Sequence, residues 1–439
     1  MNRLLHCLPR LRPLASLVLA TAAVAPQIAH AQDSIQVWTR SWADGRRTYD
    51  RIATAFTAKT GIRVEYFNAT TDFEQRVSRA AAGGGLPDLI INDSGSTGQF
   101  QMMGLLDVVD PAAVPGGGDL HERAWDMARG VDGRYYGVPV SAQANVLFVR
   151  KDWREKLGLP APRNWAELEA LAIAFSRRDP DGNGKADTHG FALPASSQRG
   201  YTAWFASSYV WQAGGEFVRD AGNGRFKASA DSPQVAQGVG FLRKLHCELK
   251  VTQPGAMTAT TQDANKAFLS GQAGIYFSGP YHIQLFDREP GRDRIEVLPA
   301  PSGPGGAAVL AGGELAYLPK AAKNKAGAMK FIAFLISPEG QALGMKPPPG
   351  GLSVVRLPVH KSVSVGAVHQ DPRWDVVAQQ YAQNGRMQPR IPNWTRMQQL
   401  IADGLNAALA RCDGDLGTAL RQLNGRIDAE LSAQKVKAP

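Results

Sequence analysis

Residues 35–91 decide the fold, and they read IQVWTRSWADGRRTYDRIATAFTAKTGIRVEYFNATTDFEQRVSRAAAGGGLPDLII. Short apolar runs at 35–38, 62–66 and 89–91 predict three strands. Between them, apolar residues recur at helical spacing in 49–56 and 73–80, and each pattern ends at glycine. Strands that alternate with helices are joined by right-handed crossovers. The stretch therefore predicts an α/β fold built on a parallel sheet covered by helices.

The alternation continues through the rest of the chain. Residues 138–149 read as one extended segment, and 165–177 as a helix with Asn164 as its N-cap and Glu167 in the capping-box position. Similar patterns predict helices at 238–249, 326–336 and from residue 394 onward, and strands at 275–277, 297–298 and 315–318. No repeat and no low-complexity linker interrupts them, so two lobes would have to be joined by several chain crossings.

Composition limits the possible functions. The 439 residues are 44% apolar and 20% charged, typical of a globular protein with two to three domains. The formal net charge of +10 raises the possibility of a nucleic-acid partner. Lys and Arg are dispersed, however, and no aromatic-interleaved basic run occurs, so no nucleic-acid partner is expected. Three cysteines are too few for a disulfide scaffold or a multi-cysteine zinc cluster.

The first 31 residues have the pattern of a secretory signal peptide. Arg3, Arg10 and Arg12 form a basic segment, 14–25 is a short apolar run, and 29–31 reads Ala-His-Ala, a small-x-small cleavage site. We expect residues 1–31 to be removed, together with three of the positive charges. No cysteine follows the apolar run, so we expect a periplasmic protein without a lipid anchor.

Two cysteines remain after that removal. Cys247 and Cys412 lie far apart in the sequence. An oxidising compartment permits a disulfide between them, but nothing in their spacing requires one. A bridge and two buried thiols are both compatible with the sequence.

Motifs of covalent chemistry are absent. The sequence contains no GxGxxG after a strand, no GxxxxGK[ST], no HExxH and no GxSxG. Ser96 has Ser94 rather than glycine two residues before it, so it lacks the pattern of a hydrolase elbow. The segment 94–98 is better read as a helix start whose amides and Ser94 hydroxyl could hold a polar ligand. We expect no enzymatic activity.

One loop resembles part of a calcium site. Asp179, Asp181, Asn183 and Asp187 occupy oxygen-ligand positions of an EF-hand-type loop, but Gly190 stands where the bidentate glutamate belongs. A structural calcium ion is one interpretation, and an Asx/Gly turn after the helix is the favoured one. No other cofactor is expected.

Seven short motifs in a fixed order match a known family. They are Ile35-Gln36-Val37-Trp38, Leu86-Pro87-Asp88-Leu89-Ile90 with Gly104-Leu105-Leu106-Asp107, Gly133-Arg134-Tyr135-Tyr136-Gly137-Val138-Pro139, Asn164-Trp165-Ala166-Glu167-Leu168, the segment 267–273, Gly279-Pro280-Tyr281 and the segment 331–340. With these motifs the chain resembles the extracellular solute-binding proteins of bacterial sugar ABC importers, the group that includes the maltose- and glycerol-phosphate-binding proteins.

The resemblance implies a type II periplasmic-binding-protein fold. Two α/β lobes, 32–140 plus 300–337 and 141–299 plus 338–439, would be joined by a discontinuous hinge around an interlobe ligand cleft. It further implies a monomer that captures a carbohydrate or polyol and presents it to the permease subunits of an ABC transporter in the inner membrane.

The resemblance also assigns candidate ligand-binding residues by position. They are Arg40, Trp42, Asn92, Asp93, Ser94, Gln143, Trp204, Tyr281, Glu314 and Arg356. Aromatic faces suit the C–H surfaces of sugars, and planar polar groups suit their hydroxyls. For Trp204 the alternative is a core position, because it lies in an aromatic segment that also contains Tyr201 and Trp211.

Other functions remain open at this level. A periplasmic carbohydrate-active enzyme is one, and a binding protein for an anionic solute such as glycerol 3-phosphate or a glycerophosphodiester is another. The anionic reading requires Arg40 and Arg356 to line the cleft, which would make affinity sensitive to salt. Because a few side chains set the ligand in such proteins, the sequence does not name the sugar.

Overall fold

The computed structural model describes residues 33–70 and 72–439, so the predicted signal peptide lies outside the described residues. The first sheet begins with β1 (Ser34–Arg40), β2 (Arg63–Ala69) and β3 (Leu89–Asp93). β1 lies between the other two and pairs with both in parallel, as the opening residues predict.

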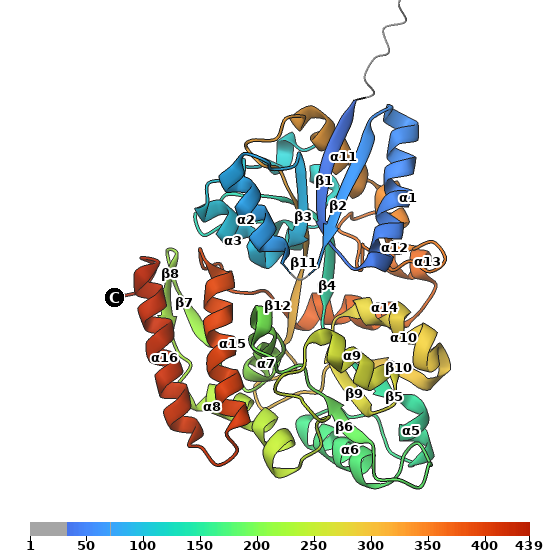
Figure 1. Cartoon of the computed structure of the whole chain (residues 1–439), viewed down its shortest axis with the longest axis vertical. Coiled ribbons are helices and arrows are strands. Elements are labelled where there is room, and N and C mark those ends of the chain that lie inside the picture. Colours follow the sequence, from blue (N-terminus) through green and yellow to red (C-terminus); the bar gives the residue numbers. More distant parts are fainter. Residues whose placement is uncertain (1–32, 71) are drawn as a thin grey trace, which may run out of the picture. The chain divides into compact units, whose positions relative to one another are not determined.

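The first sheet is completed by strands from much later in the chain. β11 (Val309–Tyr317) pairs antiparallel with β3 and with β4 (Val138–Ala144), and β12 (Gly385–Arg386) joins the end of β11. α1 (Ala43–Thr60) packs on β2 and against α12 (Pro338–Met345), whereas α11 (Lys325–Ile336) packs on β1 and β4. Figure 1 shows these elements together, with α2 (Phe73–Gly83) beside β3.

A second sheet forms the centre of the other lobe. Its strand order is β10 (Ile295–Leu298), β5 (Val146–Arg150), β9 (Ala273–Ser278) and β6 (His189–Ala192). α6 (Trp165–Arg177) and α9 (Thr261–Leu269) pack on it. The Asn164 side chain accepts the Glu167 N–H at 3.0 Å, which confirms the predicted N-cap of α6.

The segment 138–149 is extended, as predicted, but the sequence pattern does not show that it changes sheets. The segment is two strands in two different sheets, and the break falls at Asn145. The Asn145 N–H donates to the carbonyl of Leu310 in β11 at 2.9 Å, next to the paired residues Ala144 and Ala311, and β5 then pairs with β9. The chain therefore passes between the lobes at Asn145, and it passes back between β10 and β11. The exact boundaries between the lobes stay a prediction.

Helices of the second half form a further layer. α7 (Tyr201–Gln212) contacts α8 (Pro233–Arg243), which begins five residues earlier than predicted, and α15 (Trp394–Ala410), which pairs with α16 (Leu416–Ala433). The remaining elements are α3 (Thr97–Met102), α4 (Glu122–Asp126), α5 (Lys151–Lys156), α10 (Ile283–Phe286), α13 (Val365–His369), α14 (Arg373–Gln379) and the hairpin β7 (Val218–Gly222)–β8 (Arg225–Ala228). Short helical turns include η1 (Ser94–Ser96), η4 (Gln198–Gly200) and the π-helical η5 (Lys244–Glu248).

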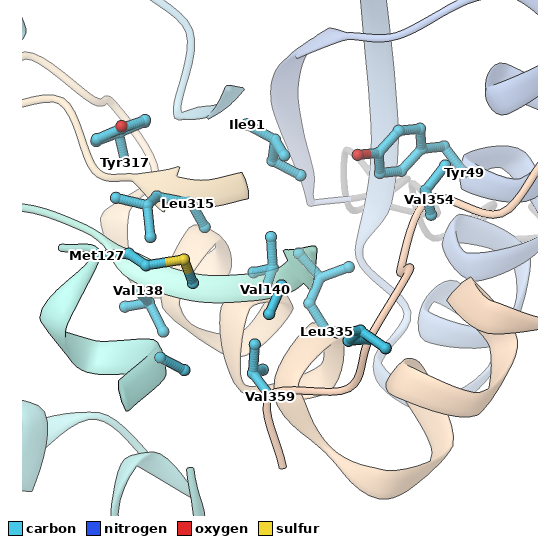
Figure 2. Close-up of a cluster of buried hydrophobic side chains, with 14 of the residues drawn as sticks. Tyr49, Ile91, Met127, Val138, Val140, Leu315, Tyr317, Leu335, Val354 and Val359 are labelled. Carbon is cyan, nitrogen blue, oxygen red and sulfur yellow. The ribbon is translucent and has the colours of Figure 1, made fainter. Parts of the chain in front are cut away.

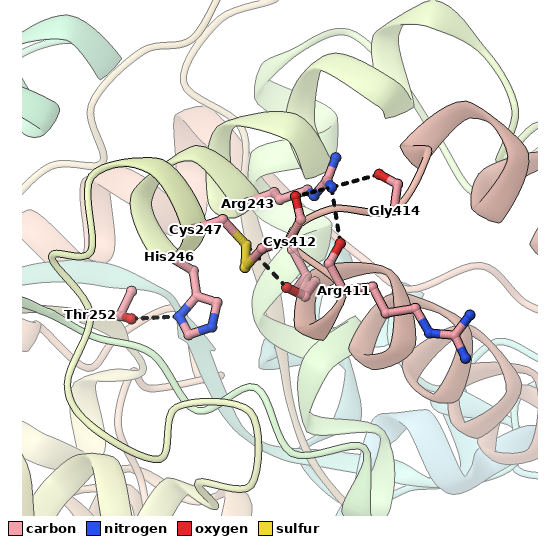
Figure 3. The surroundings of a disulfide bond; sticks show 8 residues. Arg243, His246, Cys247, Thr252, Arg411, Cys412 and Gly414 are labelled. Atoms are coloured by element: carbon pink, nitrogen blue, oxygen red, sulfur yellow. Dashed lines mark hydrogen bonds between the residues drawn. A yellow bond between two sulfur atoms is a disulfide. The ribbon is translucent and has the colours of Figure 1, made fainter.

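A disulfide connects two helical segments of this layer. Cys247 in η5 and Cys412 after α15 form a disulfide, with their Cα atoms 5.3 Å apart. Of the two possibilities left open by the sequence, the structure therefore has the disulfide and not two free thiols. Beside it, Arg243 Nη2 donates to the carbonyl oxygens of Arg411, Cys412 and Gly414 at 2.9, 2.7 and 2.6 Å (Figure 3). The bridge therefore ties the end of α15 to the helix that continues α8.

The core of the first lobe brings together residues from distant parts of the sequence. Figure 2 shows Ile91, Val140 and Leu315 from three strands beside Leu335 of α11 and Val359. All five side chains are buried. Burial of each such side chain contributes about 1.5–3 kcal/mol, so late segments of the chain are needed to complete the first lobe.

Among residues 33–70 and 72–439, no helix combines the length and the apolar character needed to cross a bilayer.

Candidate functional site

Polar side chains gather where β1 and β3 end. Arg40 is the last residue of β1 and Asp93 the last of β3, and parallel pairing brings both strand ends to one edge of the sheet. Their side chains form an ion pair, each about one-quarter exposed. Burial alone would lower the pKa of Arg40, but the charges of Asp93, Glu74 and other neighbouring groups together outweigh it, and the net pKa is raised. Arg40 therefore keeps its positive charge, and the negative charge of Asp93 balances it.

Glu314 and Arg356 form a second ion pair close to the first. Glu314 lies opposite Asp93 in the register of β11 and β3, and Oε1 of Glu314 is 3.0 Å from Nη1 of Arg356. The Tyr49 hydroxyl donates to the other carboxylate oxygen at 3.4 Å. Burial raises the pKa of Glu314, although Arg356 acts in the opposite direction. Two carboxylates and two guanidinium groups thus lie together with no excess charge.

Four of the predicted ligand residues line one cavity. Asp93 and Ser94 come from the end of β3 and the start of η1, Gln143 from β4, and Trp204 from α7. The cavity has a volume of about 60 Å³, which is room for about four to six water molecules. Gln143 lies opposite Gly312 of β11 in the sheet, so the missing glycine side chain leaves the wall open beside it. Residues from both lobes therefore enclose the same space.

Two further predicted residues meet each other outside that cavity lining. Trp42 at the start of α1 packs edge-on against Tyr281, with ring centroids 5.8 Å apart and an interplanar angle of 87°. The His282 ring contacts both of these rings in a tilted arrangement. His282 is fully buried, and this burial lowers its pKa to about 3, so the imidazole is neutral. The contact joins α1 of the first lobe to the segment after β9.

Asn92 is placed differently from the other candidates. Its side chain is buried, and Nδ2 donates to Ser96 Oγ at 2.9 Å and to Glu74 Oε1 at 3.2 Å. The side chain does not line the cavity. Asn92 therefore holds the turn after β3 and the α2 carboxylate in place. Whether any of the ten candidates binds a ligand stays a prediction.

One wall of the cavity consists of residues that were not among the predicted ligand residues. Residues 387–392 and Trp394 line it, together with Asp126 and Arg129. Trp394 is 6% exposed, and its indole N–H has no hydrogen-bond partner among the described residues. The segment 387–392 has no periodic pattern and no motif, so only its proximity to Gly95 and Gly98 in three dimensions identifies it.

The calcium-like loop forms a compact turn. The Asp179 carboxylate accepts the backbone N–H groups of Gly182, Asn183 and Gly184 at 3.0–3.1 Å, and Asn183 Nδ2 donates to Asp181 and Asp187. These bonds satisfy the loop's own oxygens in the manner of an Asx turn. Calcium binding by Asp179, Asp181, Asn183 and Asp187 stays a prediction.

The chain is similar in sequence and in structure to known proteins. Residues 41–342 match the family model described as bacterial extracellular solute-binding protein. The fructooligosaccharide ABC transporter substrate-binding protein FusA of Streptococcus pneumoniae is 24% identical over 278 residues, which cover 56% of this chain and 49% of FusA. The chain thus spans about half the length of this and several other curated relatives.

Two further matches extend over most of the molecule. The putative ABC transporter periplasmic-binding protein YcjN of Escherichia coli is 24% identical over 392 residues, covering 84% of this chain and 85% of YcjN. The structure of maltose-bound MalE3 of T. maritima superimposes with a TM-score of 0.77 at 25% identity, covering 91% of this chain and all of MalE3. The two-lobe type II fold is therefore shared, and the chain belongs to the family of bacterial extracellular solute-binding proteins.

Proposed function

We propose that this protein reversibly binds a neutral carbohydrate or polyol in the cavity beside Trp204 and delivers it to an ABC transporter permease. The observation that supports this most is the lining of one cavity by an indole ring together with Asp93, Ser94 and Gln143. An aromatic face covers the C–H surface of a sugar, and carboxylate, hydroxyl and amide groups bond its hydroxyls. A space of about 60 Å³, with room for about four to six water molecules, is similar in size to a short polyol, and a sugar ring requires the cavity walls to move apart.

The arrangement of charge favours a neutral ligand over an anionic one. Arg40 is paired with Asp93, and Arg356 with Glu314. An anion such as glycerol 3-phosphate would have to compete with those carboxylates for the guanidinium groups. A neutral sugar instead accepts and donates hydrogen bonds without separating either pair.

The known relatives support the same class of ligand. FusA is named for fructooligosaccharides, and the MalE3 structure contains maltose. By analogy with YcjN, which is named as a periplasmic-binding protein, we place this protein in the periplasm, with the permease in the inner membrane as its partner. A monomer without a lipid anchor stays a prediction from the sequence. Binding and release without covalent change require no catalytic group, which sets this function apart from that of a carbohydrate-active enzyme.

A thermal-shift screen of sugars, polyols and sugar phosphates tests the proposal. A neutral ligand at about 100 times its Kd should stabilise the protein by about 2.7 kcal/mol. The ligand recovered afterwards should be chemically unchanged, which separates binding from hydrolysis. A shift with sugar phosphates alone, or with amino acids or peptides alone, would overturn the assignment.

A further inference from the structure

Arg199 of the second lobe reaches across to α2 of the first lobe. Its Nη2 donates to both carboxylate oxygens of Glu74, at 3.0 and 3.1 Å, and its Nη1 donates to the Thr70 carbonyl at 2.9 Å. The two side chains are only 20% and 14% exposed. Solvent screening is weak at such exposure, so this pair is stronger than an ordinary surface ion pair.

Each partner is held firmly by its own lobe. Glu74 also accepts a hydrogen bond from Asn92 Nδ2 at 3.2 Å, which fixes it to the end of β3. Arg199 has a left-handed backbone with φ of +54°, and Gln399 of α15 donates to the neighbouring Ser197 carbonyl at 2.8 Å. The Glu74 side chain and the Arg199 backbone are therefore fixed by their own lobes, which reduces the conformational entropy lost when the contact forms.

Both partners are connected to residues of the candidate site, Glu74 through a hydrogen bond and Arg199 through the sequence. Asn92, which holds Glu74, precedes Asp93, and Arg199 precedes by five residues Trp204, which lines the same cavity. A change in the angle between the lobes would move Arg199 away from Glu74 while leaving each lobe intact. The pair therefore exists only when the two walls of the cavity are close together.

We propose that the Arg199–Glu74 ion pair is an interlobe latch that stabilises the closed state and sets how long a ligand is retained. The retention part rests on the proposed function. A contact made only in the closed state shifts the equilibrium toward closure by its own free energy, whether or not ligand is present. Loss of the latch therefore increases the open population of the free protein and speeds ligand release.

The ligand-free protein provides the first test. Spin labels on A82C in α2 and T395C in α15, both at exposed positions, report the distance between the lobes by pulsed electron resonance. R199Q and E74Q should each broaden the distribution toward longer distances, and the charge swap E74R/R199E should restore part of the short-distance population. R76Q is the matched control, because Arg76 pairs with Asp72 within α2 itself at 2.8 Å. Distributions for R199Q and E74Q that superimpose on that of the parent would overturn the latch.

Stopped-flow dissociation of a ligand found in the thermal-shift screen provides the second test. R199Q should release it about tenfold faster with a small change in association rate, whereas R76Q should not differ from the parent. Equal release rates would overturn the retention role. If no carbohydrate binds, the proposed function fails while the label distances still decide on the latch.

Discussion

Glu314 lies opposite Asp93 in the pairing of β11 with β3, and each carboxylate is bound to a different arginine. The Glu314–Arg356 pair is the more buried of the two, with side chains 12% and 15% exposed. Since the strands fix the two acids side by side, each needs its own cation to limit their mutual repulsion. Together the two carboxylates and the two guanidinium groups carry no net charge.

Removal of one member of the Glu314–Arg356 pair should cost stability. In E314Q the Arg356 guanidinium stays largely buried and loses its counter-charge, so the free energy of unfolding should fall by about 2 kcal/mol, less than for a fully buried pair. Urea denaturation measures this loss. The double variant E314Q/R356Q should lose less than the sum of the single variants. Strict additivity would show that the pair is not coupled.

Trp204 should contribute to ligand affinity and little to folding. Its ring lines the cavity and is only partly buried, so W204A should weaken sugar binding by about tenfold or more, as loss of an aromatic contact surface does. Isothermal titration calorimetry with the screened ligand measures the change. W211F is the control, because Trp211 is 7% exposed and does not line the cavity. Unchanged affinity in W204A would assign Trp204 to the core instead.

The Cys247–Cys412 disulfide should stabilise the protein without affecting its ligand. It closes a loop with a sequence separation of 165, for which the chain-entropy description gives about 5 kcal/mol, and measured bridges typically contribute about 2–4 kcal/mol. C247S/C412S should therefore melt at a lower temperature. Because neither cysteine lines the cavity, the ligand affinity of the folded variant should match that of the parent. An unaltered melting temperature would contradict the stabilising role.

Asp371 should make stability depend on acid. Burial alone would raise its pKa, but hydrogen bonds from Arg373 outweigh it and hold the pKa below the ordinary value of 3.8. A carboxyl whose pKa is lowered on folding stabilises the protein above the ordinary value, and that stability is lost as pH falls through the folded-state pKa. D371N should thus be less stable than the parent at neutral pH by about 2 kcal/mol. The difference should shrink below about pH 4, as urea titrations at several pH values would reveal; a constant difference would contradict it.

Local patterns predict some of these elements well because their causes are local. The helix 165–177 was bounded correctly, since Asn164 caps it and an apolar face follows at helical spacing. The break at Asn145 escaped prediction because the chain is extended on both sides of it and no glycine marks a boundary. Which sheet each half joins is decided by β9 and β11, which lie more than a hundred residues away.

In the candidate site, too, some residues were predicted from the sequence and others depend on parts of the chain that are distant in sequence. The resemblance assigned Arg40 and Asp93, and their positions at the ends of parallel strands explain why their side chains meet at one edge. Asn92 precedes Asp93 in β3, so its side chain points to the opposite face of the strand, where its amide donates to Ser96 and Glu74. Trp394 belongs to no motif of the sequence, and it faces the cavity because the start of α15 lies next to η1.

Gly98 of α3 tests the close contact between α3 and the segment 387–392. A Cβ added at Gly98 would lie 2.3 Å from the Pro392 carbonyl oxygen and 2.7 Å from that of Ile391, both backbone atoms. G98A must therefore push α3 away from the segment 387–392, and overpacking of this kind costs about 1–3 kcal/mol. Since both elements line the cavity, affinity for the screened ligand should fall about tenfold as well. G83A is the matched control: a Cβ there meets nothing within 4 Å, and alanine in place of glycine in a helix should be neutral or stabilising. If G98A bound ligand and resisted urea as well as G83A does, the close contact between α3 and the segment before α15 would be refuted.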